Sequence, residues 1–490
     1  MQNLNEIIKN YGNPDILIDS WENKYEGYAI WKSEDTILWD SSGLFHSNKK
    51  IKSSLDSFQK IIDQWKSEAG TIPAVGFISY NFKNILYPKI KFKNFNKKFP
   101  YLFFVKPQKV VKYKIQESNY KKSKIQFLDN IIDYDIYEKK INEIKNDLYS
   151  GNAYQINYTI NTMYECFDSG FDTYLGLRNI VKPPHGYYMK FNDYEILSFS
   201  PELFFKTQNN IIYSYPMKGT RGRSTNQKID HKLKLELEKS SKDMAEHLMI
   251  VDLLRNDIGK ISTYGGVKVN DIFNIKSFET VHQMVSCVEG NLKKNIKESD
   301  IIKALFPGGS ITGAPKESAM KIIDKLENYS RDLYTGSIGY INKNGDLNFN
   351  IAIRTMTIKN NKGSYWDLKS YLSSVLTSNN FQEVQTLSFV NNDKNFLFNP
   401  EKKYVQVFNA IDQSSKFMRS NLMSSLIDVY KLNYDQNNLS NSYFEINTVF
   451  DTSKNKIYED VPNQNIVLGF LTSSTLSNTD TRLKDQELDL

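Results

Sequence analysis

Two residues with reactive side chains stand in apolar surroundings near the middle of the chain. Lys218 lies in YSYPMKGTRGR, between an apolar segment that indicates a strand and a Gly-Thr turn. If this lysine is partly buried, its amine becomes a candidate nucleophile. Glu202 interrupts the apolar strand pattern of LSFSPELFF, and a carboxyl in such surroundings has a raised pKa and can act as a general acid. Two strands joined by a turn can bring the pair together, although an exposed turn lysine and an edge carboxylate would give the same pattern.

An acidic pair follows in KSSKDMAEHLMIVDLLRNDIGK, residues 239–260. The segment has apolar residues at helical spacing, and Asp243 and Glu246 fall on one face of the predicted helix. Carboxylates in this arrangement can hold Mg²⁺, which takes one or two protein carboxylates and keeps several waters. A solvated acidic face opposite the core is the alternative.

A glycine-rich turn enters a predicted helix in LFPGGSITGAPKESAMKIIDKL, residues 305–326. With Pro315 in the first turn, the backbone N–H groups of Gly313 and Ala314 would point at a bound anion such as a carboxylate. The segment lacks the spacing of a P-loop. The glycines could instead only make a tight entry turn.

The segment YTGSIGYINKNGDLNFNIAIRTM predicts a hairpin with its turn at Asn344 and Gly345. Arg354 then falls within an apolar strand, where a guanidinium needs an anionic partner and a carboxylate suits it. Tyr340 on the partner strand could approach the same point. An internal Asp or Glu is the other possible partner of the arginine.

The elements that must position these residues extend over a chain of 490 residues, which is too long for one ordinary core. Strand-like runs such as AVGFISYNF predict a strand-rich lobe over residues 1–130. A helix is expected over residues 131–150, with Asp133 or Asp135 as its cap and Gly151 at its end. Helical and strand patterns then alternate, which predicts a catalytic domain over residues 131–395. Beyond Trp366 the composition changes, and residues 367–490 are rich in Ser, Asn, Asp and Lys. Residues 396–490 form an unassigned extension.

Composition limits the possible partners. The 63 Lys and Arg nearly balance the 56 Asp and Glu. The lysine cluster around Phe92 and Phe95 fits the pattern of a nucleic-acid surface only weakly, so solvated loops are preferred and no nucleic acid is expected. No apolar run approaches the about 20 residues that span a bilayer, and no signal peptide is recognisable at the start, so no membrane is expected. With two cysteines, a disulfide framework is excluded and the cytoplasm is the expected compartment.

Taken together, these motifs resemble the chorismate-utilising enzymes, which include component I of anthranilate synthase, component I of aminodeoxychorismate synthase, and the isochorismate and salicylate synthases. The resemblance runs from about Gly151 to Arg354 and is carried by GNAYQINYT, SFSPELFF, YPMKGTRGR, KDMAEHLMIVDLLRNDIG, FPGGSITGAPK, GSIGY and IAIRTM. It implies an α+β fold in which β-sheets pack against outer helices. It also allows a tryptophan bound in the N-terminal lobe near Ser20.

Within this family, the motifs favour aminodeoxychorismate synthase component I. Anthranilate synthases carry alanine in a PIAGT-like motif where this chain has Lys218, whereas PMKGT resembles the PIKGT of aminodeoxychorismate synthases. Enzymes that add water place a lysine where this chain has Gln155, and a glutamine cannot deprotonate water. Anthranilate synthase component I and a catalytically impaired chorismate-binding homologue are the alternatives.

The resemblance implies a role for each of these residues. Lys218 adds at ring C2 while Glu202 protonates the departing C4 hydroxyl, and ammonia then displaces the lysine to give 4-amino-4-deoxychorismate for para-aminobenzoate and folate synthesis. Mg²⁺ on Glu246 anchors the ring carboxylate, and Arg354 with Tyr340 holds the enolpyruvyl carboxylate. His282 is expected near the ring, or as a satisfied core residue, and Thr220 beside the lysine.

The chain departs from the family pattern after Arg354. The family's GGGIV-type loop is absent, and the segment reads DLKSYLSSVLTSNN, followed by FQEV. The spacing makes Glu383 the expected second metal ligand. Ammonia is expected from a separate glutamine amidotransferase subunit, because Cys166 and Cys287 lie outside any nucleophile-elbow motif.

Overall fold

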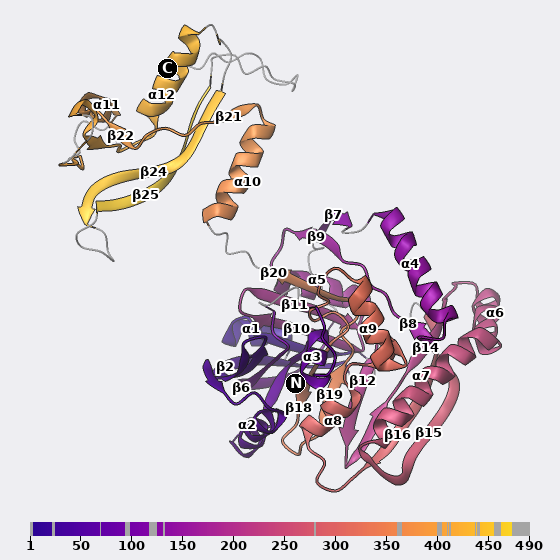
Figure 1. Ribbon diagram of the computed structural model, residues 1–490. Helices are drawn as coiled ribbons and strands as arrows, with labels where there is room; N and C mark the ends of the chain where they lie inside the picture. Colours follow the sequence, from indigo (N-terminus) through magenta and orange to yellow (C-terminus); the bar gives the residue numbers. More distant parts are fainter. Residues whose placement is uncertain are drawn as a thin grey trace. The chain divides into compact units, whose positions relative to one another are not determined.

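The structure of the chain is a computed structural model that describes residues 3–21, 25–68, 70–93, 99–116, 125–130, 133–278, 281–359, 365–398, 404–408, 410, 413–436, 438, 442–454 and 462–472. The chain divides into two compact units, Met1–Asn360 and Asn361–Leu490. Figure 1 shows the helices and strands of both units.

One large sheet organises the first unit. Its strands are β1 (Ile16–Ser20), β2 (Glu26–Asp40), β3 (Gly43–His46), β4 (Lys49–Ile51), β5 (Ala74–Ile78), β6 (Leu102–Lys114), β10 (His185–Phe191), β11 (Tyr194–Ser200), β12 (Leu203–Gln208), β13 (Ile211–Ser214), β14 (Met217–Gly222), β15 (Ser262–Ser277), β16 (Val281–Leu292), β18 (Ser337–Ile341), β19 (Leu347–Asn350) and β20 (Thr355–Lys359). The main path through the sheet is β14-β16-β13-β12-β19-β18-β5-β6-β2-β1-β10-β11-β20, with β15 on β16 and β3 and β4 beside β2.

The sheet joins the N-terminal lobe to the central part of the chain. β1 pairs with β10, and β5 pairs with β18, both antiparallel. Residues 1–130 and residues 131–360 therefore share one sheet, whereas the sequence analysis placed a domain boundary between them. The boundary expected at 395/396 differs as well, because residues 361–395 belong to the second unit.

The sheet curls around an apolar core. Phe77 on β5 and Phe191 on β10 are separated by three intervening strands, yet their ring centroids are 5.6 Å apart. Phe103 on β6 lies 4.5 Å from the same Phe191 ring. Alternate residues of these strands face this core, so the other face is left for the helices.

Helices cover the outer face. They are α1 (Leu4–Tyr11), α2 (Leu55–Glu68), α3 (Lys83–Leu86), α4 (Tyr134–Tyr149), α5 (Gly170–Val181), α6 (Gln227–Glu238), α7 (Ser241–Gly259), α8 (Glu298–Leu305) and α9 (Lys316–Leu326), with 3-10 turns η1 (Tyr80–Phe82) and η2 (Gly309–Ile311). Figure 1 shows α6 and α7 alongside β15 and β16, against which both pack. Ile250 and Leu254 of α7 enter the largest core cluster. The architecture confirms the predicted α+β class with helices outside a sheet.

Local sequence signals placed two of these elements correctly. Asp133 caps α4, and its side chain accepts a hydrogen bond from the backbone N–H of Asp135 at 2.9 Å. β18 and β19 form the predicted hairpin, and Gly345 in the turn has φ +87. In the described part of the first unit, two short strand pairs lie outside the large sheet, β7 (Ile125–Asn130) with β9 (Thr162–Cys166) and β8 (Gln155–Ile156) with β17 (Gly313–Ala314).

The second unit is a small α+β arrangement. It contains α10 (Tyr365–Ser378), β21 (Phe381–Glu383), β22 (Phe389–Val390), α11 (Asn392–Phe398), η3 (Gln413–Ser415), β23 (Phe417–Met418), α12 (Met423–Asp435), β24 (Ser442–Lys454) and β25 (Pro462–Leu471). β21 pairs parallel to β24, which pairs antiparallel to β25. α12 packs on β24 and β25 through Leu426, and a buried ion pair joins Arg419 to Glu445 at 3.2 Å. Among the helices described in either unit, none is both long and apolar enough to cross a bilayer.

Candidate active site

Glu202 and Lys218 meet at one residue, Ser310 of η2. The hydroxyl of Ser310 donates a hydrogen bond to Oε1 of Glu202 at 2.9 Å. The amine of Lys218 donates to the carbonyl oxygen of the same serine at 3.4 Å. The structure thus brings together the two reactive groups that the sequence analysis singled out.

Three elements hold this group in place. Glu202 lies between β11 and β12, and its backbone N–H donates to the hydroxyl of Ser200 at 3.2 Å. Lys218 lies on β14 just before a bulge, where Gly219 has φ +74, a conformation that glycine adopts readily. η2 packs closely on α7, because a Cβ on Gly309 would come within 2.1 Å of the Leu253 side chain.

Burial sets the electrostatics of the pair. Glu202 is 9% exposed, and this burial raises its pKa to about 7, although the Ser310 hydrogen bond and the charge of Lys218 both act to lower it. His247 on α7 is fully buried and its Nε2 lies 2.6 Å from the Ser286 hydroxyl. Burial, with the charge of Lys218 as a second cause, lowers the pKa of His247 to about 4. Near neutral pH, Glu202 can therefore carry a proton while His247 is neutral.

Gln155, Gly313 and Ala314 come together in the β8–β17 pair. Ala314 is the partner of Gln155 in this register, and β17 packs against both η2 and α7. Within the described residues, the buried Oε1 of Gln155 has no hydrogen-bond partner, so it is available to accept one. Gly313 and Ala314 lie in a strand before α9 rather than in its first turn, and their role as anion ligands remains a prediction.

Glu246 offers one half-exposed carboxylate on α7. Its side chain is 44% exposed, and Lys242 approaches it only at 4.0 Å. Asp243 is instead engaged by Arg221, with 3.0 Å between Nη2 and Oδ2. No cluster of three or more metal-ligating side chains occurs within the described ranges. A single accessible carboxylate fits Mg²⁺, which keeps most of its coordination as water.

Glu383, expected as the second metal ligand, lies in the second unit. It ends β21, and the amine of Lys369 is 3.8 Å from its Oε1. Its role as a metal ligand remains a prediction.

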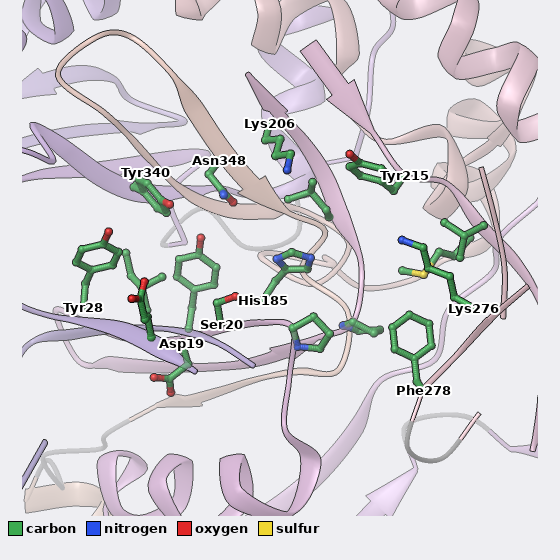
Figure 2. A pocket seen from close by; sticks show the side chains of 18 residues that line it. Asp19, Ser20, Tyr28, His185, Lys206, Tyr215, Lys276, Phe278, Tyr340 and Asn348 are labelled. Atoms are coloured by element: carbon green, nitrogen blue, oxygen red, sulfur yellow. The ribbon is translucent and has the colours of Figure 1, made fainter. Parts of the chain in front are cut away.

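Tyr340 lines a pocket to which neither Glu202 nor Lys218 contributes, contrary to expectation. This pocket, of about 370 Å³, is lined by residues from the N-terminal lobe and from the central part of the chain, including Ser20, Tyr28, His185, Leu203, Lys206, Met217 and Tyr340. Figure 2 shows Tyr28 and Tyr340 facing each other, with ring centroids 6.3 Å apart. Met217 lines the pocket while its neighbour Lys218 contacts Ser310, and successive strand residues point to opposite faces.

The pocket in Figure 2 also contains the position where the family resemblance allows a tryptophan, because Ser20 lines it. His185 in its wall has a pKa lowered to about 4 by burial, with the charge of Lys206 as a second cause. Tyr340 is thus associated with the Ser20 pocket and not with the Glu202–Lys218 pair.

The sequence analysis expected Arg354 inside a strand. It lies instead at a bend with φ +48, and it is exposed. The reason is topological. β19 pairs with β12 and β18, whereas β20 pairs with β11. The chain must turn between the two strands, and Arg354 occupies that turn, with its carbonyl accepting from the N–H of Phe199 at 3.0 Å.

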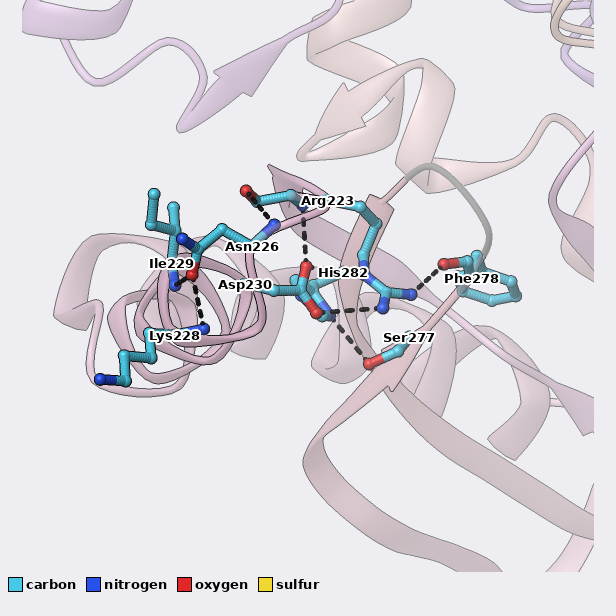
Figure 3. A network of polar contacts seen from close by, with 9 residues as sticks. Arg223, Asn226, Lys228, Ile229, Asp230, Ser277, Phe278 and His282 are labelled. Atoms are coloured by element: carbon cyan, nitrogen blue, oxygen red, sulfur yellow. Dashed lines mark hydrogen bonds and ion pairs between the residues drawn. The ribbon is translucent and has the colours of Figure 1, made fainter.

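His282 lies on β16, in a buried network that links this strand to β15 and α6. Figure 3 shows it between Ser277 and Asp230, with 2.8 Å from Nδ1 to the Ser277 hydroxyl and 3.1 Å from Nε2 to Oδ1 of Asp230. Arg223 also holds Asp230, at 2.8 Å. His282 is therefore a satisfied buried histidine in this structure, and its position near the substrate ring remains a prediction.

Thr220 does not lie beside Lys218 on one face. The bulge at Gly219 shifts the register, so that Lys218 pairs with Met284 and Thr220 with the adjacent Gln283. Adjacent strand residues face opposite sides. Thr220 is exposed, and its hydroxyl lies 3.5 Å from Nε2 of Gln283.

Sequence reasoning missed Ser310 and His247. Ser310 is in the quoted motif FPGGSITGAPK, but a serine in a glycine-rich turn has no local signal of a long-range contact. His247 directly follows Glu246 in the helix, and its apolar neighbours Ile250 and Val251 gave a hint of burial. An open cavity of about 830 Å³ adjoins this region, between Met249 and Leu253 of α7 and Ala314 of β17.

Known proteins show similarity over most of the first unit. Residues 114–367, more than half of the chain, match the family described as chorismate binding enzyme. Anthranilate synthase component 1 of Saccharolobus solfataricus is 36% identical over 299 residues, which cover 57% of this chain and 70% of that protein. Aminodeoxychorismate synthase component 1 of Bacillus subtilis is 40% identical over 222 residues, 45% of this chain and 47% of that protein. The match thus spans about half the length of the latter relative.

A solved structure agrees in fold, and a second family matches the C-terminal part. Anthranilate synthase component I from Streptococcus pneumoniae superposes with a TM-score of 0.61 at 23% identity, covering 72% of this chain and 91% of that one. Residues 351–490 match the family described as the phenylalanyl tRNA synthetase beta chain CLM domain. By its central match and its fold, the chain belongs to the chorismate-binding enzyme family.

Proposed function

We propose that the chain aminates chorismate with ammonia to give 4-amino-4-deoxychorismate. The observation that carries this proposal is the meeting of Glu202 and Lys218 at Ser310. An acid with a pKa of about 7 beside a primary amine suits a reaction in which a hydroxyl leaves as water and an amine adds. The similarity to aminodeoxychorismate synthase component 1 supports the same choice.

In the proposed reaction, each side chain has one task. The amine of Lys218 adds at ring C2 while the C4 hydroxyl departs with the proton of Glu202, so one C–N bond forms and one C–O bond breaks. Ammonia then adds at C4 and the lysine leaves C2. The balance is chorismate plus ammonia giving aminodeoxychorismate plus water. Gln155, whose Oε1 is unpartnered within the described residues, would accept a hydrogen bond from ammonia and cannot deprotonate water.

Binding of the substrate carboxylates completes the proposal. Glu246 would hold Mg²⁺, which supplies positive charge for the ring carboxylate when it is bound, and Arg354 would meet the enolpyruvyl carboxylate. Gly313 and Ala314 remain proposed backbone ligands. Ammonia would come from a separate glutamine amidotransferase subunit, and the cytoplasm is the proposed location.

The product of the purified chain tests the proposal. The chain is incubated with chorismate, an ammonium salt and Mg²⁺, and the product is identified by mass spectrometry. We expect aminodeoxychorismate, which retains the enolpyruvyl group. Anthranilate with released pyruvate would instead support the second candidate, anthranilate synthase component I, which the 70% coverage of the Saccharolobus relative favours. If chorismate remains unconsumed, the chain is a catalytically impaired homologue.

A further inference from the structure

Ser310 contacts both reactive groups with different atoms. Its hydroxyl donates to Oε1 of Glu202, and its carbonyl oxygen accepts from the amine of Lys218. Because Oε1 accepts this hydrogen bond, the proton of the carboxylic acid is left to the other oxygen, Oε2. One N–H of the Lys218 amine donates to the Ser310 carbonyl, and the remaining positions on the nitrogen can contact a substrate.

The backbone around Ser310 is fixed from two sides. On one side, Gly309 allows η2 to approach Leu253 of α7 more closely than any side chain would permit. On the other side, the buried guanidinium of Arg331 donates to the carbonyl of Ile311 at 3.2 Å. Arg331 is itself held by Glu327 at 2.6 Å. Ser310 is 7% exposed, so its orientation is set by packing before any substrate arrives.

We propose that Ser310 is a positioning residue that orients the carboxyl of Glu202 for proton donation and keeps the amine of Lys218 beside it. Its catalytic meaning rests on the proposed amination. Lys218 on β14 is the charged group that acts on Glu202, and the neutral His247 on α7 faces Lys218 in turn.

Removing the hydroxyl has a consequence with a defined sign. A hydrogen bond donated to a carboxyl stabilises its ionised form, so Ser310→Ala removes one of the two influences that lower the Glu202 pKa. The titration of Glu202 should then move to higher pH by about one unit. If Ser310 had only a packing role, Ser310→Ala would leave the titration of Glu202 unchanged.

The experiment follows the carboxyl itself in the full-length chain. The protonated carboxyl band is measured by infrared difference spectroscopy over a pH series and is assigned by its loss in Glu202→Gln. Ser310→Ala is compared with Ser310→Thr, which keeps a hydroxyl. Ser214→Ala is the matched control, because it removes another buried hydroxyl, one that donates to the carbonyl of Phe204 at 2.7 Å. Ser310→Cys, of similar size and a weak donor, serves if the alanine variant does not fold.

The expected result is an upward shift of about one unit in Ser310→Ala or a smaller one in Ser310→Cys, with no shift in Ser310→Thr or Ser214→Ala. The alkaline limb of the rate of chorismate consumption should move with the band, and kcat should fall more than KM rises. An active Ser310→Ala variant with an unshifted band overturns the role of Ser310 alone. A wild-type chain that leaves chorismate unconsumed overturns the proposed function, and the catalytic role of Ser310 with it.

Discussion

The chemistry at Glu202 and Lys218 depends on which of the two groups holds a proton. Water around a carboxyl stabilises its charge, and Glu202 has lost nearly all of that water. Its pKa of about 7 means that it is still protonated in a large fraction of molecules near neutral pH. Lys218 is half-buried and donates to a backbone carbonyl rather than to a carboxylate.

Lys218→Ala should abolish amination at C4 by the proposed route, because no covalent adduct with the lysine can form. The measurement is the rate of aminodeoxychorismate formation across a pH range. Lys206→Ala is a matched control, since Lys206 lines the pocket that contains Tyr340. A Lys218→Ala variant that works at the wild-type rate would show that this lysine is not the nucleophile, and partial rescue by high ammonia would point to direct attack.

Glu202→Gln should lower kcat by about 10² to 10⁴, the usual contribution of a general acid. In the wild type, the acid must be protonated, so activity should fall as pH rises through about 7. Initial rates over a pH series would show this limb. If the rate of Glu202→Gln falls over the same pH range, this fall in activity belongs to the titration of another group.

Stability should follow the same titration. The folded pKa of Glu202 lies above its ordinary value of 4.5, so the folded state binds more protons between the two values. The free energy of unfolding should therefore decrease as pH rises from about 4.5 to about 7, by roughly 3 kcal/mol for this group. Chemical denaturation of the wild type and Glu202→Gln would show the difference. Parallel pH dependence in both proteins would contradict the contribution.

Glu246→Gln should weaken the dependence on Mg²⁺ and raise the chorismate requirement, because a ligand charge is lost. The measurement is a Mg²⁺ titration of the amination rate. Glu383→Gln tests the second ligand in the same assay, since an equal weakening would support it and an unchanged titration would remove it. An unchanged titration in Glu246→Gln would likewise remove Glu246 from the site.

At the scale of elements, short sequence motifs correctly predicted the features that depend on neighbouring residues, such as helix caps and turns. The cap at Asp133 and the turn at Gly345 depend on residues a few positions away, and both appear in the structure. The motif order between Gly151 and Arg354 was enough for the fold and for the pairing of Glu202 with Lys218. The errors at Thr220 and Tyr340 have a different origin. Each depends on the register of distant strands, and one bulge residue reverses the face that follows it.

Gly313→Ala should separate β17 from β8. Gly313 has φ +139, and a Cβ there would lie 2.1 Å from the carbonyl oxygen of Gln155, so the backbone must move. The expected loss of stability is roughly 2 kcal/mol or more, with lower activity because Gln155 loses its partner strand. Gly259→Ala is the control, since no heavy atom beyond its chain neighbours and the backbone of its own helix lies within 4 Å of its Cβ position in the described structure. Equal denaturation midpoints for both variants would contradict this view of the β8–β17 pair.

At the scale of the molecule, two family matches meet near the boundary between the units. The chorismate-binding match ends at residue 367, the second match begins at residue 351, and the compact units divide after Asn360. The sequence analysis recognised a change of composition there but could not assign the C-terminal part. The reason is physical. Short apolar runs among Ser, Asn and Lys do not specify strand partners, and β24 takes partners from both sides in sequence, β21 and β25.

Whether the chain can take its nitrogen from glutamine depends on its two cysteines. Glutamine hydrolysis of the kind used by this family's amidotransferases needs a reactive cysteine thiolate with a histidine. Cys287 is half-buried, and burial raises the pKa of its thiol, which disfavours the thiolate. The Sγ of Cys166 lies 3.2 Å from the hydroxyl of Thr173 and 3.4 Å from the carbonyl of Asp168. Neither of these two contacts of Cys166 is with a histidine, the partner that this hydrolysis needs.

We therefore expect the purified chain to aminate chorismate with ammonium salts and to fail with glutamine. Product formation is measured with each nitrogen source, and a glutamine amidotransferase subunit is then added, which should restore the use of glutamine. The double variant Cys166→Ser, Cys287→Ser is the control, and it should retain the ammonium-dependent rate because neither thiol takes part. Glutamine-dependent amination by the isolated wild type, lost in the double variant, would instead reveal a glutaminase centre within this chain. The same activity surviving in the double variant would point to a contaminating amidotransferase, because a chain without cysteine cannot form the thioester that this hydrolysis requires.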